Sequence, residues 1–241
     1  MLRGMWVFPL LAALIALVFA GLLMRQWFGR RRTYQAIWAV ALLMYALASF
    51  EVFLGGLGGW TSGEFRVYWL LGAVLNVPLL ALGELELLVK HKGVRAALYV
   101  ITVFVTAYAI ARVRTAGIHS VALAEDLPSG KEVFGDGTPA HRLPQFVSIP
   151  AYVVLVGGAI WSATRMRGRA ELRDRFLGTL LIALGATVIA GFGSAFAALG
   201  YLAAFTISLL AGIAIMFWGF LRASRQARGP SSAPADTPAE L

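Results

Sequence analysis

Seven uninterrupted apolar blocks constrain what this chain can fold into more than any other feature of its sequence. A helix rises about 1.5 Å per residue, so about 20 apolar residues are enough to cross a hydrocarbon layer about 30 Å thick. The chain therefore predicts an all-α fold, a polytopic membrane protein with a seven-helix transmembrane bundle over residues 1–228. The expected spans are roughly 5–24, 35–57, 67–88, 96–113, 146–164, 176–199 and 202–221.

The composition agrees with this class and excludes several kinds of site. Of the 241 residues, 59% are hydrophobic and only 14% are charged. Soluble domains have about 45–50% apolar and about 25% charged residues. The chain has no cysteine, which excludes disulfides, thiolate metal ligands and a cysteine nucleophile. His91, His119 and His141 all fall between the apolar blocks, so we expect no cofactor and no metal site within the spans, and no enzyme activity.

Basic residues cluster in four of the segments that connect or follow the blocks, and the net charge is +9. Short basic clusters beside apolar spans are typical of cytoplasmic loops next to anionic lipid and argue against nucleic-acid binding. The clusters comprise Arg25, Arg30, Arg31, Arg32, Lys90, Lys92, Arg95, Arg165, Arg167, Arg169, Arg173, Arg175, Arg222, Arg225 and Arg228. We therefore expect the N-terminus outside, the C-terminus in the cytoplasm, and a location in the plasma (cytoplasmic) membrane, the inner membrane of a bacterium.

One sizeable loop, at about 114–145, is expected on the outer side. Its stretch EDLPSGKEVFGDGTP has turn signals on both sides of KEVF. This pattern fits a small hairpin or an ordered lid, and it fits a flexible connector equally well. The tail at 229–241, GPSSAPADTPAEL, has a composition that cannot form a core, and we expect it to be disordered in the cytoplasm.

Two acids lie near the inner end of the third block. A charged group within the bilayer costs about 2.5–3.5 kcal/mol even on favourable insertion scales, so each acid needs an explanation. Glu86 has Lys90 four residues further along and lies close to the interface, which favours a structural ion pair. Glu84 has no cation three or four residues ahead, and both an interfacial role and a site remain open for it.

A third acid, Glu51, lies deeper, in the stretch FEVFLGGLGG. No cation lies within one turn on its own helix, so a partner must come from another span, with Arg112 the first candidate and Arg66 the second. If paired, Glu51 joins two helices; if unpaired, it is an acid that can exchange a proton. Gly55 and Gly59 behind it have GxxxG spacing, which allows close helix approach.

Near the middle of the third block, Asn76 precedes Pro78. Pro78 lacks an amide hydrogen, leaves the carbonyl of Val74 without its helical partner and is expected to kink the helix, with Asn76 bonding the exposed groups. A polar side chain beside a broken helix is found at midplane ligand sites, and it is also found where an ordinary kink is repaired.

Glycines indicate how the last two spans should pack. Gly200, in the sequence ALGY, allows a tight turn that divides one long apolar run into two spans. Gly178 and Gly185 in one span, and Gly212 and Gly219 in the next, are each seven residues apart and predict packing faces.

The number of spans and their orientation resemble those of microbial rhodopsins and of small transporters built as a 3+1+3 repeat. The last block, YLAAFTISLLAGIAIMFWGFL, contains no lysine, which excludes a retinal Schiff base. The stretch FRVYWLLGAVLNVPLLALGELELL at 65–88 is similar to seven-span integral membrane proteins of bacteria, and this resemblance implies no particular activity.

These observations support two functional hypotheses. Acids at two depths, with a polar kink between them, favour a small-solute or proton-coupled transporter in which Glu51 is the outer acceptor, Asn76 and Pro78 form the midplane contact, and Glu84 is the inner acceptor. The alternative is a membrane receptor or accessory subunit without transport activity. A membrane enzyme that uses Glu51 or Glu84 as a general base is least supported, because a single carboxylate would stand in for the usual pair. The expected partners are the bilayer, anionic lipid at the basic loops, and a protein partner or a second copy.

Overall fold

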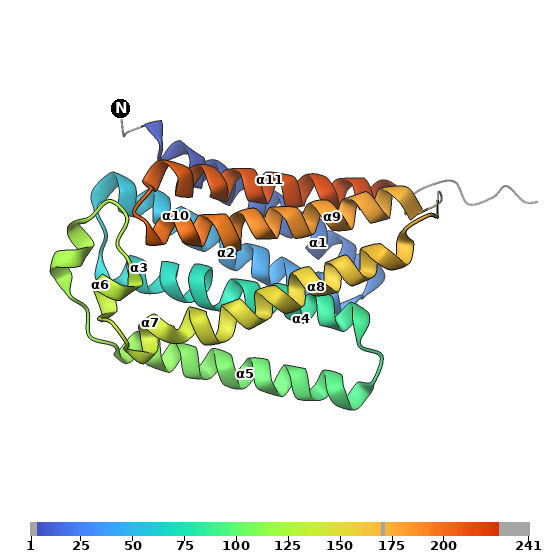
Figure 1. The fold of residues 1–241 in the computed structure, drawn as a ribbon, viewed down its shortest axis with the longest axis horizontal. Helices are drawn as coiled ribbons and strands as arrows, with labels where there is room; N and C mark the ends of the chain where they lie inside the picture. Colours follow the sequence, from blue (N-terminus) through green and yellow to red (C-terminus); the bar gives the residue numbers. More distant parts are fainter. Residues whose placement is uncertain (1–3, 170–171, 227–241) are drawn as a thin grey trace, which may run out of the picture.

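The computed structural model describes residues 4–169 and 172–226 as a bundle of helices (Figure 1). Seven helical stretches are long and apolar enough to cross a membrane, which confirms the all-α class and the number of spans. The elements of these stretches are α1 (Val7–Arg30), α2 (Thr33–Gly58), α3 (Ser62–Tyr68), η2 (Trp69–Leu75), α4 (Asn76–Leu88), α5 (Lys92–Thr115), α7 (Pro139–Leu143), η4 (Pro144–Ser148), α8 (Ile149–Met166), α9 (Arg173–Thr187), η6 (Val188–Gly193), α10 (Ser194–Ala198) and α11 (Leu202–Gln226). The tail at 229–241 lies outside the described residues.

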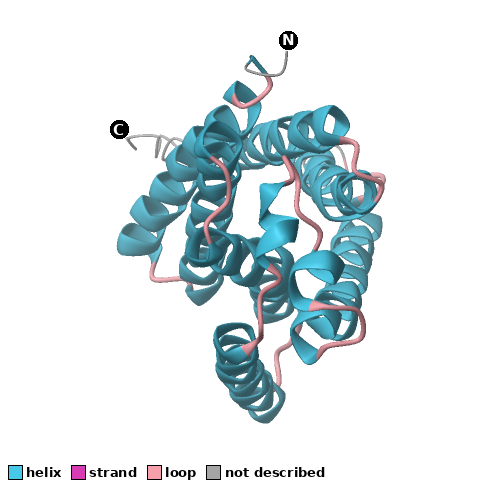
Figure 2. Cartoon of the chain, turned by 90° about the vertical axis from the view of Figure 1, so that its left-hand side faces the viewer, coloured by secondary structure: helices cyan, strands magenta, loops and turns pink. Residues whose placement is uncertain are grey.

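Six of the seven spans close into a ring. Each packs on the next in the order α1, α2, α4, α8, α9 and α11, and α11 packs back against α1 (Figure 2). The seventh span, α5, lies outside this ring against α4, and only 6% of its most apolar 18-residue stretch is buried. The bundle is therefore a six-helix ring with one peripheral helix.

Small residues allow α9 and α11 to approach most closely. A Cβ atom at Gly178 would lie 2.5 Å from the carbonyl oxygen of Gly219, and one at Gly185 would lie 2.5 Å from that of Gly212. Contacts this short exclude any side chain larger than hydrogen. The packing faces predicted from the seven-residue glycine spacing are confirmed, and the two faces meet each other.

Three of the spans contain a turn of π-helix: η2, η4 and η6. In the first, the amide of Asn76 donates to the carbonyl of Leu71, five residues back instead of four. Such turns are rare within α-helices and add one residue to a turn. A widened turn therefore lies just before Pro78, where a kink was expected.

The segment between α5 and α7 is an ordered lid over one end of the bundle, which we call the capped end. It contains η3 (Ser120–Ala124) and α6 (Gly130–Phe134), so its local structure is helical and not the hairpin considered from the sequence. The indole nitrogen of Trp60 donates to Asp126 O at 3.3 Å, and that of Trp69 donates to Ala140 O at 3.0 Å. Phe65 and Phe134 complete an aromatic cluster beneath the lid.

The fifth span begins at Pro139, seven residues before the expected start at 146. Thr138 accepts a hydrogen bond from the amide of His141, and Pro139 occupies the first turn, where its missing amide hydrogen is not needed. Pro144 begins the π-helical turn η4.

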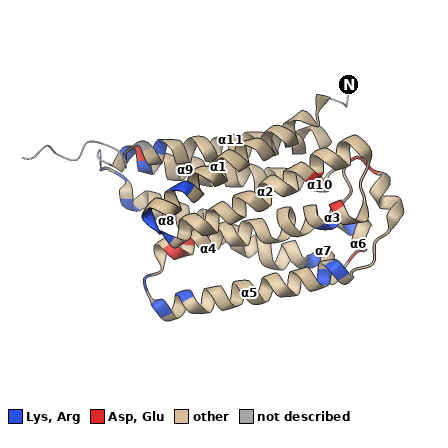
Figure 3. Cartoon of the chain, turned by 180° about the vertical axis from the view of Figure 1, so that it is seen from behind, with Lys and Arg blue, Asp and Glu red and all other residues tan. Residues whose placement is uncertain are grey.

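Lysine and arginine gather at the end of the bundle opposite the lid, which we call the basic end (Figure 3). A smaller group lies at the capped end, near α7 and the end of α5. The unequal distribution of charge along the bundle axis follows the clusters seen in the sequence.

Candidate functional site

A small cavity lies at the centre of the six-helix ring. Its volume is about 20 Å³, which is room for one water molecule. Its walls come from α2, α4, α8, α9, η6 and α11, and they consist of Leu42, Tyr45, Asn76, Val77, Leu80, Leu155, Ala186, Ile189, Ala190, Ile213 and Met216. A cavity of this size has no room for a larger solute.

The two polar side chains at the cavity connect helices to one another. Asn76 is 4% exposed, and its Nδ2 donates to Ala41 O on α2 at 2.7 Å. The hydroxyl of Tyr45 donates to Leu209 O on α11 at 2.8 Å. These bonds join α4 to α2 and α2 to α11 across the ring, so both side chains have a structural role at the level of the cavity.

The carbonyl group of Val74, which Pro78 leaves without its helical donor, has a partner other than Asn76. The hydroxyl of Ser148 donates to Val74 O at 3.0 Å and to Ala73 O at 2.7 Å. The prediction that Asn76 repairs this kink is wrong, because its amide is bonded to α2. No local pattern links Ser148 to a proline some 70 residues earlier in the chain, so the sequence carried no signal for this contact.

Glu84 is buried in the ring near the basic end. It is 6% exposed and packs against α8, where a Cβ atom at Gly158 would lie 2.9 Å from its Cγ. Among the described residues, none forms a hydrogen bond or an ion pair with its carboxyl group. Asn76, Leu80 and Glu84 follow one another at four-residue spacing and so lie on one face of α4. Glu84 is therefore one turn beyond the cavity wall, toward the basic end.

Glu51 lies apart from both Asn76 and Glu84. It is partly buried, its Oε2 has no hydrogen-bond partner in the described part of the chain, and it does not line the central cavity. Arg66 donates instead to the carbonyls of Val113 and Ala116, the latter at 2.7 Å. The structure does not bring Glu51 together with Asn76 and Glu84, the amide and the second acid that were proposed to form one path with it.

The other expected partner of Glu51 is also engaged elsewhere. The guanidinium of Arg112 lies 5.1 Å from the centre of the Tyr108 ring on its own helix. Within residues 4–169 and 172–226, the ion pairs expected between Glu51 and these two arginines are not formed.

The glycines behind Glu51 make room for aromatic rings and not for a neighbouring helix backbone. A Cβ atom at Gly55 would lie 2.4 Å from the Trp60 ring, and one at Gly56 would lie 2.1 Å from the Trp6 ring. Gly59 has φ +82° and ends α2. The motif therefore lets two indoles fold over the end of α2.

Glu86 forms an ion pair, as expected, but with a different cation. Arg95 Nε lies 2.8 Å from Glu86 Oε2, and a second guanidinium nitrogen contacts Oε1. The prediction of Lys90 as the partner is wrong. The turn between α4 and α5 places Arg95 over the carboxylate, and this pair fastens the two helices at the basic end.

A second, larger cavity opens on the side of the bundle between α4 and the peripheral helix α5. Its volume is about 220 Å³, and we call it the lateral cleft. Its lining residues are Leu75, Pro78, Leu79, Ile101, Thr102, Val105, Thr106, Phe146 and Val147. Pro78, predicted at a midplane site, thus faces this cleft and not the central cavity. The cleft was not predicted from the sequence, because the length and hydropathy of α5 are similar to those of the other spans.

The fold and the length of its apolar helices define a multi-pass integral membrane protein. No family model, no curated protein and no solved structure matches the chain. Within the described residues, no group of three or more His, Asp or Glu side chains could hold a metal ion. The class of the protein therefore rests on the seven helices, and any function must be argued from the two cavities, the lid and the peripheral helix.

Proposed function

We propose that the protein is a membrane receptor or accessory subunit, in which the six-helix ring is a scaffold and the lid and α5 are the interacting surfaces. The observation that carries this proposal is the separation of the candidate path residues. Asn76 lines a cavity of about 20 Å³, Glu84 packs against Gly158, and Glu51 lines neither cavity. A solute carrier needs polar groups that converge on a solvated space near its midplane.

The exposure of α5 supports the same function. Val100, Val103 and Phe104 are 70%, 69% and 69% exposed, on a helix that contributes little to the closed ring. Exposed apolar residues are expected on any lipid-facing helix, but a span held outside the ring can contact a partner without disturbing the core. We infer from the charge distribution that the basic end faces the cytoplasm and the lid faces outward.

The absence of cysteine allows a direct test of this proposal by site-specific crosslinking in native membranes. Val103→Cys and Phe104→Cys on α5 should form specific adducts with a neighbouring protein. Val18→Cys on α1 and Leu47→Cys on α2, which are 56% and 52% exposed, should not. Purified protein in proteoliposomes should show no solute or proton flux above that of empty vesicles. Equal crosslinking at all four positions would argue against α5 as an interacting surface.

A proton-coupled transporter is the second candidate, and one observation favours it. Glu84 is a buried carboxyl group with no ion pair among the described residues, one helical turn from the central cavity on the same face of α4. Intramembrane acids of this kind occur in proton relays. A pH-dependent flux that Glu84→Gln abolishes, with thermal stability unchanged, would establish transport and overturn the receptor proposal.

A further inference from the structure

The lateral cleft is an apolar space that opens toward the surroundings of the bundle. It lies between the closed ring and α5, and its rim residues Ile101 and Phe146 are 57% and 72% exposed. The hydroxyl of Thr102 in its wall donates to Leu98 O at 2.8 Å, so it is already engaged. A water molecule needs two to four polar partners, and these walls are mainly aliphatic. At membrane depth, the medium that enters such a space is hydrocarbon.

A basic turn connects α4 to α5 at the basic end of the bundle, and these are two of the helices that flank the cleft. Lys90 and Lys92 are exposed there, and no described acid pairs with either of them. The third cation of the turn, Arg95, is paired with Glu86. Basic pockets between spans at this kind of interface bind anionic lipid headgroups. The turn therefore offers two ammonium groups without a described acid partner at the end of the two helices that flank the cleft.

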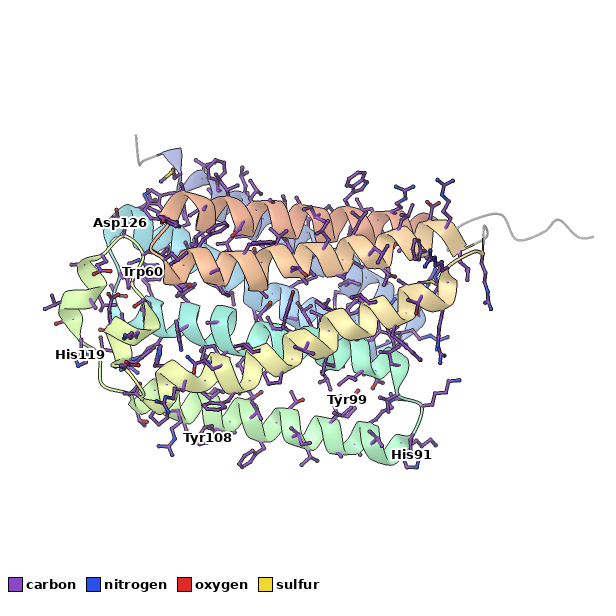
Figure 4. The ribbon with its side chains drawn as sticks, in the orientation of Figure 1. Trp60, His91, Tyr99, Tyr108, His119 and Asp126 are labelled. Atoms are coloured by element: carbon purple, nitrogen blue, oxygen red, sulfur yellow. The ribbon has the colours of Figure 1, made fainter. Side chains whose placement is uncertain are left out.

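Between the basic turn and the cleft lies a hydroxyl group without a partner. The Tyr99 hydroxyl is buried, and it forms no hydrogen bond within the described chain. Its side chain lies between α5 and α4 (Figure 4). Tyr99, Thr102 and Thr106 are spaced by three and four residues, which places Tyr99 on the face of α5 that lines the cleft. Tyr99 itself does not line the cleft, and a buried hydroxyl group without an acceptor in the protein calls for one from a bound molecule such as water or lipid.

The order of chemical groups along α5 matches the order of groups in a phospholipid. Lys92 precedes Tyr99 by seven residues, or about 10 Å, and Thr102 follows Tyr99 by three residues, or about 5 Å. From the basic turn inward, the chain thus presents ammonium groups, then a hydrogen-bond donor, then an apolar space. A phospholipid presents a phosphate, then an ester, then an acyl chain.

We propose that the lateral cleft is a binding site for an anionic phospholipid of the leaflet at the basic end. Lys90 and Lys92 hold the phosphate of the headgroup, the Tyr99 hydroxyl donates to an ester carbonyl, and an acyl chain fills the cleft between α4, α5 and η4. This site does not rest on the proposed function, because it uses the face of α5 with Thr102 and Val105, which lines the cleft, and not the exposed face with Val103 and Phe104.

The test uses the full-length protein in detergent, with phosphatidylglycerol and phosphatidylcholine of identical acyl chains added in competition. Native mass spectrometry measures the retained lipid. The wild type should retain one phosphatidylglycerol in preference to phosphatidylcholine. Lys90→Gln/Lys92→Gln should reduce this preference about 25-fold, since each cation near an anionic group contributes roughly fivefold. Arg30→Gln/Arg31→Gln, in the basic turn between α1 and α2, is the matched control and should leave the preference unchanged.

A second variant separates the ester contact from the headgroup contact. Tyr99→Phe removes one hydrogen bond to a group that both lipids share, so it should weaken both about equally and leave the preference intact. Val105→Phe, which fills the cleft, should prevent retention of either lipid.

Three outcomes would overturn the proposal. The first is equal retention of the two lipids by the wild type, and the second is a loss of preference in the Arg30→Gln/Arg31→Gln control as large as that in the lysine variant. The third is a change of oligomeric state in Val105→Phe without a change in lipid retention, which would make a second protein helix the occupant of the cleft.

Discussion

The hydroxyl of Ser148 donates to the carbonyl of Val74 at 3.0 Å, across the interface between the third and fifth spans. Val74 is four residues before Pro78 and therefore has the carbonyl that this proline leaves without a helical donor. In hydrocarbon no water can replace such a donor, so the bond must come from another part of the protein. One hydroxyl group on η4 thus makes the break in the third span tolerable.

Ser148→Ala should lower the free energy of unfolding by about 0.6 kcal/mol and by no more than about 1.7 kcal/mol, the mean and the maximum measured for hydrogen bonds between spans. In a Pro78→Ala background, Val74 regains a helical donor and the same substitution should have a smaller effect. The double-mutant cycle is measured by SDS-induced unfolding in mixed micelles. Equal losses in both backgrounds would show that Ser148 acts independently of the proline.

Gly185→Ala should destabilise the bundle by about 1–3 kcal/mol, as expected for overpacking of a tight interface. The added Cβ atom would lie 2.5 Å from the Gly212 carbonyl oxygen and 2.4 Å from Met216 Cγ. Gly21→Ala on α1 is the matched control, because its Cβ atom would have no neighbour within 4 Å. The two variants are compared by thermal unfolding in one detergent, and equal melting temperatures would refute close contact between α9 and α11.

The neighbouring acids Glu84 and Glu86 should differ in how their substitution changes stability. Glu84→Met removes a buried carboxyl group that has no ion pair among the described residues, so stability should stay the same or increase by up to about 2 kcal/mol. Glu86→Gln breaks the bond to Arg95 and should lower stability by about 1–3 kcal/mol. Unfolding free energies of both variants are measured under identical conditions. A large loss in Glu84→Met would mean that this carboxyl group has a stabilising partner, such as bound water.

Trp69→Ala should loosen the lid. It removes the bond to Ala140 O and the ring that packs against Gly130, and loss of a buried aromatic side chain costs about 3–5 kcal/mol. Trypsin should then cut after Lys131 at least about tenfold faster, measured from the initial rate at low protease. Trp161→Ala on α8, where the ring is 56% exposed, should leave the rate unchanged. No acceleration in Trp69→Ala would show that the lid is held by its other contacts.

The number and approximate position of the spans were predictable because the bilayer dictates how many apolar residues each must have, although the fifth span begins seven residues before the expected start. The glycine faces of α9 and α11 were predictable for a related reason, since residues seven apart lie on one side of a helix. The start of the fifth span at Pro139 was not predictable in this way. Pro139 is favourable in a first turn that Thr138 precedes, whereas a proline taken alone is typical of a loop.

The partners of the polar residues were not predictable, because they depend on which helices become neighbours. Arg66 is close in sequence to Glu51, yet it caps the end of α5. Asn76 is two residues from Pro78, yet it bonds to α2. Both side chains satisfy carbonyl groups of helices that only the packing of the whole bundle brings near, and carbonyl groups leave no signature in an amino-acid sequence.

The peripheral helix α5 is fastened at its two extremities and has few buried residues between them. Arg95 holds one extremity through Glu86, and Arg66 holds the other through Val113 and Ala116. We expect a molecule that enters or leaves beneath the middle of α5 to change the curvature of this helix without separating its ends from the bundle.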